Sequence, residues 1–316
     1  MKVIYGVGKV KVSFKKPIVT IGIFDGVHLG HKFIIKKLID KAKKINGTSV
    51  VLTFDPHPKN ILRPKKYLPL LISIEHRVKL LRDLGVDVCI IEEFSQGFSR
   101  LSPEGFIRRL FVKTIKPQEV FVGSGFTFGR SASGDIDLLR ELGRQHNFKV
   151  NEVLPIKIGK EIVSSTSIRR LIRQGDLHKA SKFLGREVSI LGKVRRGRNI
   201  GRLLGYPTAN IYPCGEIIPP TGVYAARVNF DKKKRLAAMA YIGSRPTYNK
   251  KVKDRCFDIE VHIFDFKKKI YGRYIEIEFL KEMRDERKFS SQEELKKQIE
   301  KDQKAVKHFL KAHHKK

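Results

Sequence analysis

The first half of the chain carries short continuous apolar runs, and between these runs apolar residues recur every three or four positions. A continuous run is typical of a strand buried on both faces, whereas the longer spacing is typical of an amphipathic helix. The predicted strands are 18–23, 50–54, 86–91, 120–122 and 150–153, and the predicted helices between them include 32–44, 74–84 and 103–114. This alternation predicts a parallel sheet with crossover helices, whose ligands bind beyond the carboxyl ends of the strands.

From Gly185 onward the pattern changes to short segments in which apolar and polar residues alternate. Such alternation predicts half-buried strands, and the glycines and lysines between them predict turns. The expected strands are 188–194, 222–230, 237–243, 258–264 and 275–279, followed by one helix, 292–310. We therefore expect a small antiparallel β-barrel with a C-terminal helix, and two domains that span residues 1–184 and 185–316.

The chain has 316 residues, which is enough for two domains that each bury a core. Its three cysteines, Cys89, Cys214 and Cys256, are widely separated and form no CxxC pair, which argues against a disulfide framework or structural zinc. The first residues lack the apolar core of a signal peptide, and no apolar run approaches the length of a membrane span. These features predict a cytoplasmic protein without a membrane partner.

The formal net charge of +34 raises the question of nucleic-acid binding. Both predicted domains share the excess of lysine and arginine, and it is not gathered into an arm. We therefore interpret it as a generally basic surface with incidental attraction to polyanions, and expect no specific nucleic-acid partner. Specific nucleic-acid binding and electrostatic help with phosphorylated substrates are the alternatives.

The segment GIFDGVHLGH, residues 22–31, lies where the first buried strand gives way to a helix. Unpaired N–H groups and the helix dipole favour a phosphate at such a point, and the glycines of the segment let the backbone approach it. His28 and His31, three residues apart, can project from one side of the first helical turn towards a transferred phosphoryl group. A glycine-rich turn with two incidental surface histidines is the alternative.

Polar or aromatic residues also follow two further predicted strands. Asp55 and His57 belong to TFDPHP, residues 53–58, where two prolines stiffen the strand exit. Phe126 and Phe128 alternate in a glycine-rich segment and could sandwich a flat heteroaromatic ring. A solvent-facing turn in the first case and core packing in the second are the alternatives.

The segment VSSTSIRRLI, residues 163–172, predicts a helix capped by Ser or Thr. The hydroxyls of Ser165 and Thr166, the N–H groups at the helix start and the Arg169 side chain together could bind an anion. A plain capped helix would have the same sequence.

In the second half, GRNIGRLLGYPTANI, residues 197–211, joins a basic glycine-containing loop to a stiff segment with hydroxyl and amide oxygens, which suits a magnesium-bound nucleotide. Glu260 lies in the alternating strand DIEVHIFDF, residues 258–266, and points to the face opposite Ile259 and Val261. It is either a solvent-facing charge or a general base, and an ordinary charged loop would likewise explain residues 197–211.

These segments resemble one family in content and in order. HxGH resembles the signature of the nucleotidylyltransferase superfamily, and GxFDGxHxGH with SSTxIR resembles the adenylyltransferase module of bifunctional riboflavin kinase/FAD synthetases. GRxLGxPTAN, the ExHIxDF…YG pattern and MRDERKF, residues 283–289, resemble the riboflavin kinase module. The resemblance extends from about Ile18 to Asp302.

The resemblance implies a Rossmann-like nucleotidylyltransferase domain followed by a riboflavin kinase barrel. Riboflavin and ATP would give FMN in the barrel, and FMN and ATP would give FAD and pyrophosphate in the first domain, with Mg²⁺ as cofactor. Glu260 would be the kinase base, Thr208 and Asn210 would hold the metal, and His28, His31 and Arg169 would stabilise the adenylyl transfer. The implied substrate contacts are Gly22, Phe24, Asp25, Gly26, Gly30, Asp55, His57, Gly123, Phe126, Phe128, Ser165, Thr166, Gly197, Arg202, Pro207, Arg284 and Phe289.

One position departs from the family pattern. Gly125 stands where a family member usually has an asparagine or aspartate, whose oxygen would help place magnesium or the phosphates. A working kinase with a weakened adenylyltransferase is therefore an alternative to two full activities. In either case the expected partners are small molecules, with a homo-oligomer as a further possibility.

Overall fold

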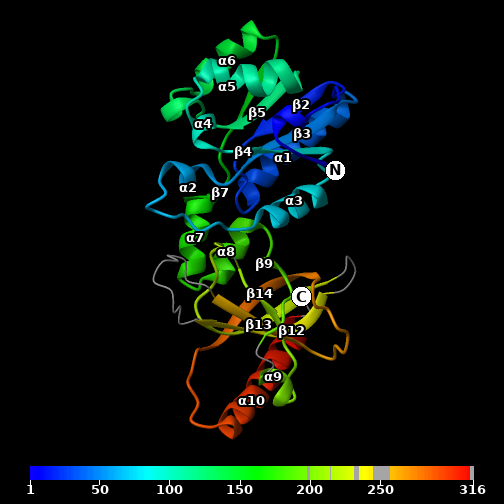
Figure 1. The fold of residues 1–316 in the computed structure, drawn as a ribbon, viewed down its shortest axis with the longest axis vertical. Coiled ribbons are helices and arrows are strands. Elements are labelled where there is room, and N and C mark those ends of the chain that lie inside the picture. Colours follow the sequence, from blue (N-terminus) through cyan, green and yellow to red (C-terminus); the bar gives the residue numbers. More distant parts are fainter. Residues whose placement is uncertain (198–199, 214, 231–234, 245–256, 314–316) are drawn as a thin grey trace. The chain divides into compact units, whose positions relative to one another are not determined.

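The computed structural model describes residues 1–197, 200–213, 215–230, 235–244 and 257–313 of the chain (Figure 1). They form two compact units: Met1–Leu70 with Ile74–Ser165, and Leu71–Ser73 with the residues from Thr166 onward. The units divide earlier than residue 184, because α7 (Ser165–Arg173) and α8 (Leu177–Leu184) fall almost entirely in the second unit. There α8 packs on β9 (Val188–Lys193) and β14 (Tyr274–Asp285). The functional boundary at residues 184 and 185 stays a prediction.

The first unit contains a six-stranded sheet with the strand order β1-β4-β3-β2-β5-β6, and every pairing in it is parallel. The prediction of a parallel α/β sheet is therefore confirmed. The sequence pattern does not predict β1, because only Ile4 of this edge strand is buried. The strands are β1 (Lys2–Tyr5), β2 (Pro17–Ile21), β3 (Thr48–Asp55), β4 (Val88–Glu93), β5 (Glu119–Gly123) and β6 (Lys149–Val153).

Helices connect these strands, as expected for parallel neighbours. The predicted helix 103–114 is divided into an α-helix, α5, and a π-helix, η2. The elements between the strands are η1 (Val7–Lys9), α1 (Leu29–Lys44), α2 (Pro58–Leu62), α3 (Ile74–Asp83), α4 (Gln96–Ser99), α5 (Pro103–Ile107), η2 (Arg108–Ile115), η3 (Arg130–Ala132) and α6 (Ile136–Gln145). A short hairpin, β7 (Lys157–Ile158) and β8 (Glu161–Ile162), completes the unit.

The strand order places the predicted motifs next to one another. β2 lies between β3 and β5. The chain adds β3 and β4 on one side of β2 and later adds β5 and β6 on the other side. Ligands of open parallel sheets bind at such a reversal, beyond the carboxyl ends of the strands. The segments 22–31, 53–58 and 123–135 all begin at or near these strand ends. The sequence prediction that they cluster at one edge of the sheet is confirmed.

The second unit is built on an antiparallel sheet with the order β10-β13-β12-β11-β14-β9. Beyond the end of β9, the Arg195 N–H donates to the Asn210 carbonyl at 2.8 Å, which joins the two edge strands of the curled sheet. The predicted antiparallel barrel fold is therefore confirmed. Its further elements are α9 (Ile200–Leu203), β10 (Ala209–Ile211), β11 (Gly222–Asn229), β12 (Arg235–Ser244), β13 (Phe257–Ile263) and α10 (Gln292–His313).

The C-terminal helix α10 packs against β11, β12 and β14 (Figure 1). Val306 and Leu310 are buried in its apolar contact with Ala225 and Phe264. This contact confirms the predicted C-terminal helix and holds one wall of the cavity described below. No helix within the described ranges has the length and apolarity needed to cross a bilayer.

Candidate active sites of the two units

The loop between β2 and α1 turns sharply. Phe24, Gly26 and Val27 have φ angles of 51°, 91° and 40°. A residue with a side chain rarely adopts this left-handed region, so its surroundings must hold it there. Phe24 and Val27 are both buried, and their packing fixes the loop in this conformation. The loop places His28 at the N-cap of α1.

The two histidines lie against each other. The His28 and His31 ring centroids are 3.6 Å apart with a 20° angle between the planes, and His28 Nδ1 accepts from the His31 N–H at 3.4 Å. A Cβ on Gly30 would lie 3.2 Å from His28 Cε1, so glycine leaves room for the ring. Gly22 is similarly close to the Phe24 ring. The structure therefore brings the histidines together at a helix start, and their catalytic role stays a prediction.

The first residue of α7 reaches the same loop. Ser165 Oγ donates to the buried Asp25 carbonyl at 2.8 Å, so two motifs that are distant in the sequence meet within the first unit. Thr166 and Arg169 follow on α7, where Thr166 is exposed and Arg169 is buried. Both belong to the second unit, so the predicted phosphate contact of Arg169 beside the histidines stays a prediction.

The exit of β3 carries the second predicted group. His57 Nδ1 accepts from the Lys59 N–H at 3.1 Å and caps α2. Burial raises the pKa of Asp55, although the nearby Arg77 cation opposes this rise. Arg77, on α3, donates to Thr53 Oγ1 at 3.1 Å and to the Phe54 carbonyl at 3.0 Å. Sequence analysis missed Arg77, because no local pattern distinguishes it from the other basic residues of its helix.

The loop after β5 contains the two predicted phenylalanines. The Phe126 and Phe128 rings lie nearly parallel with centroids 5.7 Å apart. Inserting a flat ring between them needs about 7 Å, twice the usual stacking contact. Phe128 is buried against Phe106, which favours core packing, the alternative stated above, and contact of these two rings with a ligand stays a prediction. Gly123 ends β5, and a Cβ on Gly125 would meet nothing within 4 Å.

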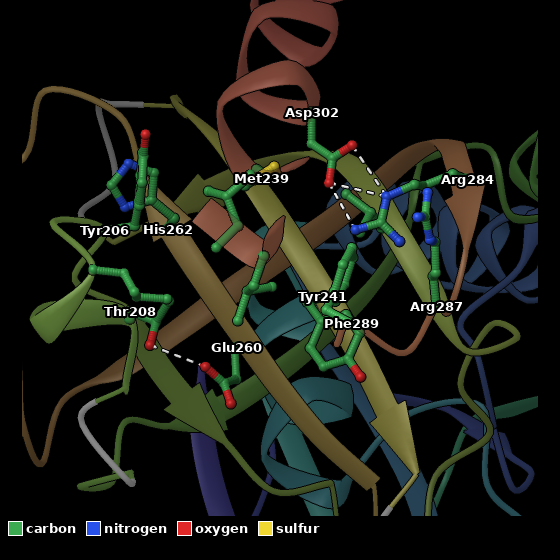
Figure 2. A pocket seen from close by; sticks show the side chains of 15 residues that line it. Tyr206, Thr208, Met239, Tyr241, Glu260, His262, Arg284, Arg287, Phe289 and Asp302 are labelled. Carbon is green, nitrogen blue, oxygen red and sulfur yellow. Dashed lines mark hydrogen bonds and ion pairs between the residues drawn. The ribbon is translucent and has the colours of Figure 1, made fainter. Parts of the chain in front are cut away.

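The second unit contains a cavity of about 300 Å³ between the sheet and α10 (Figure 2). The strand register sets one row of its wall: Glu260 pairs with Tyr241, Tyr241 with Val223, and Val223 with Arg284. Side chains at paired positions lie on the same face of a sheet. The predicted residues Glu260 and Arg284 thus face one cavity, together with Tyr241, which sequence analysis did not single out.

At one end of this cavity, Thr208 Oγ1 donates to Glu260 Oε2 at 3.2 Å (Figure 2). Asn210 pairs with Glu260 across β10 and β13, and its Nδ2 lies 3.4 Å from Thr208 Oγ1. A Cβ on Gly197 would lie 2.5 Å from the Asn210 amide group, so only glycine fits there. Three predicted residues and the Gly197 backbone therefore converge. Arg198 and the Arg202 side chain lie outside the described residues.

The Thr208 segment is tied to β13 by a histidine that sequence analysis did not single out. His262 Nδ1 lies 2.9 Å from the Pro207 carbonyl, and its ring meets the Tyr206 ring edge-to-face at 5.6 Å. Pro207 therefore acts here through its carbonyl, which holds Thr208 in place beside Glu260.

The other end of the cavity is formed by an ion pair. The Arg284 guanidinium donates to both carboxylate oxygens of Asp302 on α10, at 2.8 to 3.1 Å (Figure 2). Phe289 lies within cation–π distance of both Arg284 and Arg287. The predicted contacts Arg284 and Phe289 thus come together. Burial, with the Glu286 carboxylate as hydrogen-bond partner, raises the pKa of Tyr241, so this hydroxyl stays protonated at neutral pH.

A second hollow of about 350 Å³ adjoins the Thr208 segment. Thr208 lines both hollows, and Lys267, Lys268 and Lys269 line the second one. Three lysines favour an anionic ligand there. An apolar cavity and a basic hollow that share one hydroxyl suit a reaction between a largely uncharged molecule and a phosphate compound.

Comparison with known proteins assigns a family to each half of the chain. The FAD synthetase family model matches residues 11–167, and the riboflavin kinase model matches residues 184–310. A bifunctional riboflavin kinase/FMN adenylyltransferase of Buchnera aphidicola from Schizaphis graminum is 37% identical, over 98% of this chain and 99% of the relative. Proteins of the same name from Escherichia coli K12 and Bacillus subtilis are 33% and 34% identical, over 98% and 95% of this chain and equal shares of the relatives.

A crystal structure of a protein named macrolide-efflux protein, from Streptococcus pneumoniae, has the same fold, with a TM-score of 0.80 and 28% sequence identity. The match covers 97% of this chain and 99% of that chain. Both predicted motif sets thus lie within the matched ranges, except that SSTSIR, residues 164–169, extends two residues beyond the first range. The chain belongs to the bifunctional riboflavin kinase/FMN adenylyltransferase family.

Proposed function

We propose that the chain phosphorylates riboflavin to FMN in its second domain and adenylylates FMN to FAD in its first. The observation that carries the first step is the Thr208–Glu260 hydrogen bond at the junction of the apolar and the basic hollow. There a carboxylate can meet a substrate hydroxyl on one side and a nucleotide phosphate on the other.

In the kinase step, Glu260 accepts the proton of the terminal ribityl hydroxyl. The hydroxyl oxygen then attacks the γ-phosphate of ATP, and ADP leaves with the electrons of the broken P–O bond. The Thr208 hydroxyl orients the Glu260 carboxylate before the reaction. The cavity between the sheet and α10 holds the flavin ring, and the lysines of the second hollow attract the nucleotide.

The donor set beside Glu260 fits magnesium. Thr208 and Asn210 supply a hydroxyl and an amide oxygen, which are hard ligands of the kind that Mg²⁺ prefers. No group of three or more His, Cys, Asp or Glu side chains in the described ranges could hold a metal by itself. Mg²⁺ is commonly held by a few protein oxygens together with substrate phosphates. When bound, it would neutralise charge on the phosphates.

In the adenylyl transfer, the FMN phosphate oxygen attacks the α-phosphate of ATP, and pyrophosphate leaves. The phosphate of FMN is itself the nucleophile, so the protein needs to align the reactants and stabilise negative charge. The His28–His31 pair at the start of α1 suits this task. We assign Ser165, Thr166 and Arg169 to the same phosphates. Asp55 and His57, at the end of β3, and Gly123, at the end of β5, would contact the remaining parts of ATP and FMN.

The test is incubation of the purified chain with riboflavin, ATP and magnesium, followed by chromatography of the flavins over time. FMN that appears first and is converted to FAD would support both activities. FMN that accumulates without FAD would refute the adenylyl transfer, and no phosphorylated flavin would refute both steps.

A second candidate is a riboflavin kinase with a weakened adenylyltransferase. The glycine at position 125, where the family usually has a side-chain oxygen, favours it. Cytoplasmic location and possible homo-oligomers stay predictions in both cases.

A further inference from the structure

The first unit buries an arginine that the mechanism above does not use. Arg77 on α3 is only 1% exposed, among the most deeply buried large side chains described. A buried guanidinium is costly unless charges and hydrogen bonds compensate it. The charges that act on it most strongly are those of Asp25 and Asp55, which come from the two neighbouring strand exits. Its place is therefore set by the loops around the candidate site.

Arg77 is also the start of a chain of hydrogen bonds. Its Nη1 donates to Thr53 Oγ1 at 3.1 Å and to the Phe54 carbonyl at 3.0 Å. Thr53 Oγ1 in turn donates to the Ile23 carbonyl at 2.9 Å. One side chain therefore ties the last residues of β3 to the loop after β2. Phe54 immediately precedes Asp55, and Ile23 precedes the residues with positive φ angles.

This loop needs such support. The positive φ angles at Phe24 and Val27 are unfavourable for residues with side chains and persist only where contacts hold them. Ser165 holds the loop from one direction, through the Asp25 carbonyl. The hydrogen bonds that run from Arg77 through Thr53 hold the same loop at a second point, the Ile23 carbonyl. His28 and His31 follow directly, so a shift of the loop moves both imidazoles.

We propose that Arg77 is a positioning residue for adenylyl transfer, which acts through Thr53 to fix the loop that carries His28 and His31. Arg77 is buried, and its hydrogen-bond chain through Thr53 keeps the exits of β2 and β3 in one arrangement. The proposal rests on the adenylyltransferase function assigned above. Because alignment supplies much of this catalysis, a loop displaced by about 1 Å would cost up to about 100-fold in rate.

The test compares Arg77→Met, Arg77→Lys and Thr53→Val with Arg82→Met, a control on the exposed face of the same helix. We expect Arg77→Met to lower kcat for FAD formation about 10- to 100-fold, with smaller changes in KM for ATP and FMN. Lysine restores the charge without the planar fork and should give an intermediate rate. Thr53→Val should lower kcat in the same direction by a smaller factor.

Two further measurements separate positioning from general damage. Riboflavin kinase activity of the same variants should stay within twofold or so of wild type, since the second unit is unchanged. Amide hydrogen exchange at residues 22–31 should accelerate in Arg77→Met and Thr53→Val but not in Arg82→Met. Unchanged kcat and unchanged exchange in Thr53→Val would overturn the proposal, even if Arg77→Met fails to fold. If the wild-type chain forms no FAD, the function assigned to this domain fails, and the exchange comparison alone decides the role of Arg77.

Discussion

The two domains build phosphate-transfer sites in different ways. In the first, the candidate groups follow strand ends, and their positions depend on a loop with unusual backbone angles. In the second, Glu260, Tyr241 and Arg284 occupy one row of an antiparallel sheet, and the strand register sets their spacing. A site on loops depends on remote supports, whereas a site on a sheet depends mainly on the identity of the side chains that face the cavity.

Glu260→Gln gives the largest expected effect. The variant keeps the shape of the side chain and its contact with Thr208 but cannot accept a proton. We expect riboflavin phosphorylation to fall about 10²- to 10⁴-fold. FAD formation from added FMN should be unchanged, which chromatography of both reactions measures. Equal loss of the two activities would mean that the domains do not function separately.

His31→Ala is the corresponding change in the first domain. It removes one ring of the stacked pair and leaves the N-cap bond acceptor of His28 in place. FAD formation should fall about 100- to 1,000-fold, because a donor to the developing charge is lost. Riboflavin kinase kinetics provide the control. A full rate of FAD formation would show that the histidine pair only caps α1.

Asp302→Asn tests the wall of the cavity. The substitution removes the charge that holds Arg284 and preserves the size of the side chain. KM for riboflavin should rise about tenfold, because a partly buried ion pair loses one partner, while kcat changes less. Glu293→Gln, on the exposed first turn of the same helix, is the matched control. Identical kinetics in both variants would exclude the ion pair as a determinant of riboflavin binding.

Gly125→Asn should have a smaller and opposite effect. The Cβ meets open space, so the side chain can be added without displacing neighbours. If the missing oxygen limits adenylyl transfer, FAD formation should rise about threefold to tenfold, of the order of one added hydrogen bond. Gly125→Ala adds the Cβ without the oxygen and should have no effect. Equal rates in all three proteins would contradict the weakened-adenylyltransferase candidate.

Glu278→Gln gives the smallest effect, on stability. Burial raises the pKa of Glu278, whose partners are Asn229 and Arg235. The folded chain therefore holds this proton more tightly than the unfolded chain, and wild-type stability falls as the pH rises from 4.5 through the raised folded pKa. Glutamine avoids that loss, so the stability of the variant should rise relative to that of the wild type as the pH increases towards neutral. Thermal unfolding should show the difference disappearing below pH 4.5; a difference independent of pH would contradict the assignment.

The sequence predicts the strands around the first site because each is a continuous apolar run. It predicts the position of the motifs because they come directly after these runs. Alternation places Glu260 on the face opposite Ile259 and Val261, and only the family resemblance identifies it as the base. The sequence does not predict β10, since three residues after a proline carry no periodic signal. Nor does it distinguish Phe128 as a core residue, or Asp302 among the acidic residues of α10. These roles depend on tertiary contacts, which local patterns do not contain.

The bond that joins the two edge strands of the barrel also affects how the protein behaves in solution. An open sheet edge offers unpaired backbone groups to strands of other molecules, and such edges promote aggregation. Here the Arg195–Asn210 bond closes the edge, and Asn210 is also the residue assigned to the metal and nucleotide. By pairing residues beside the two edge strands, this bond reduces the unpaired backbone that the curled sheet offers to strands of other copies of the chain.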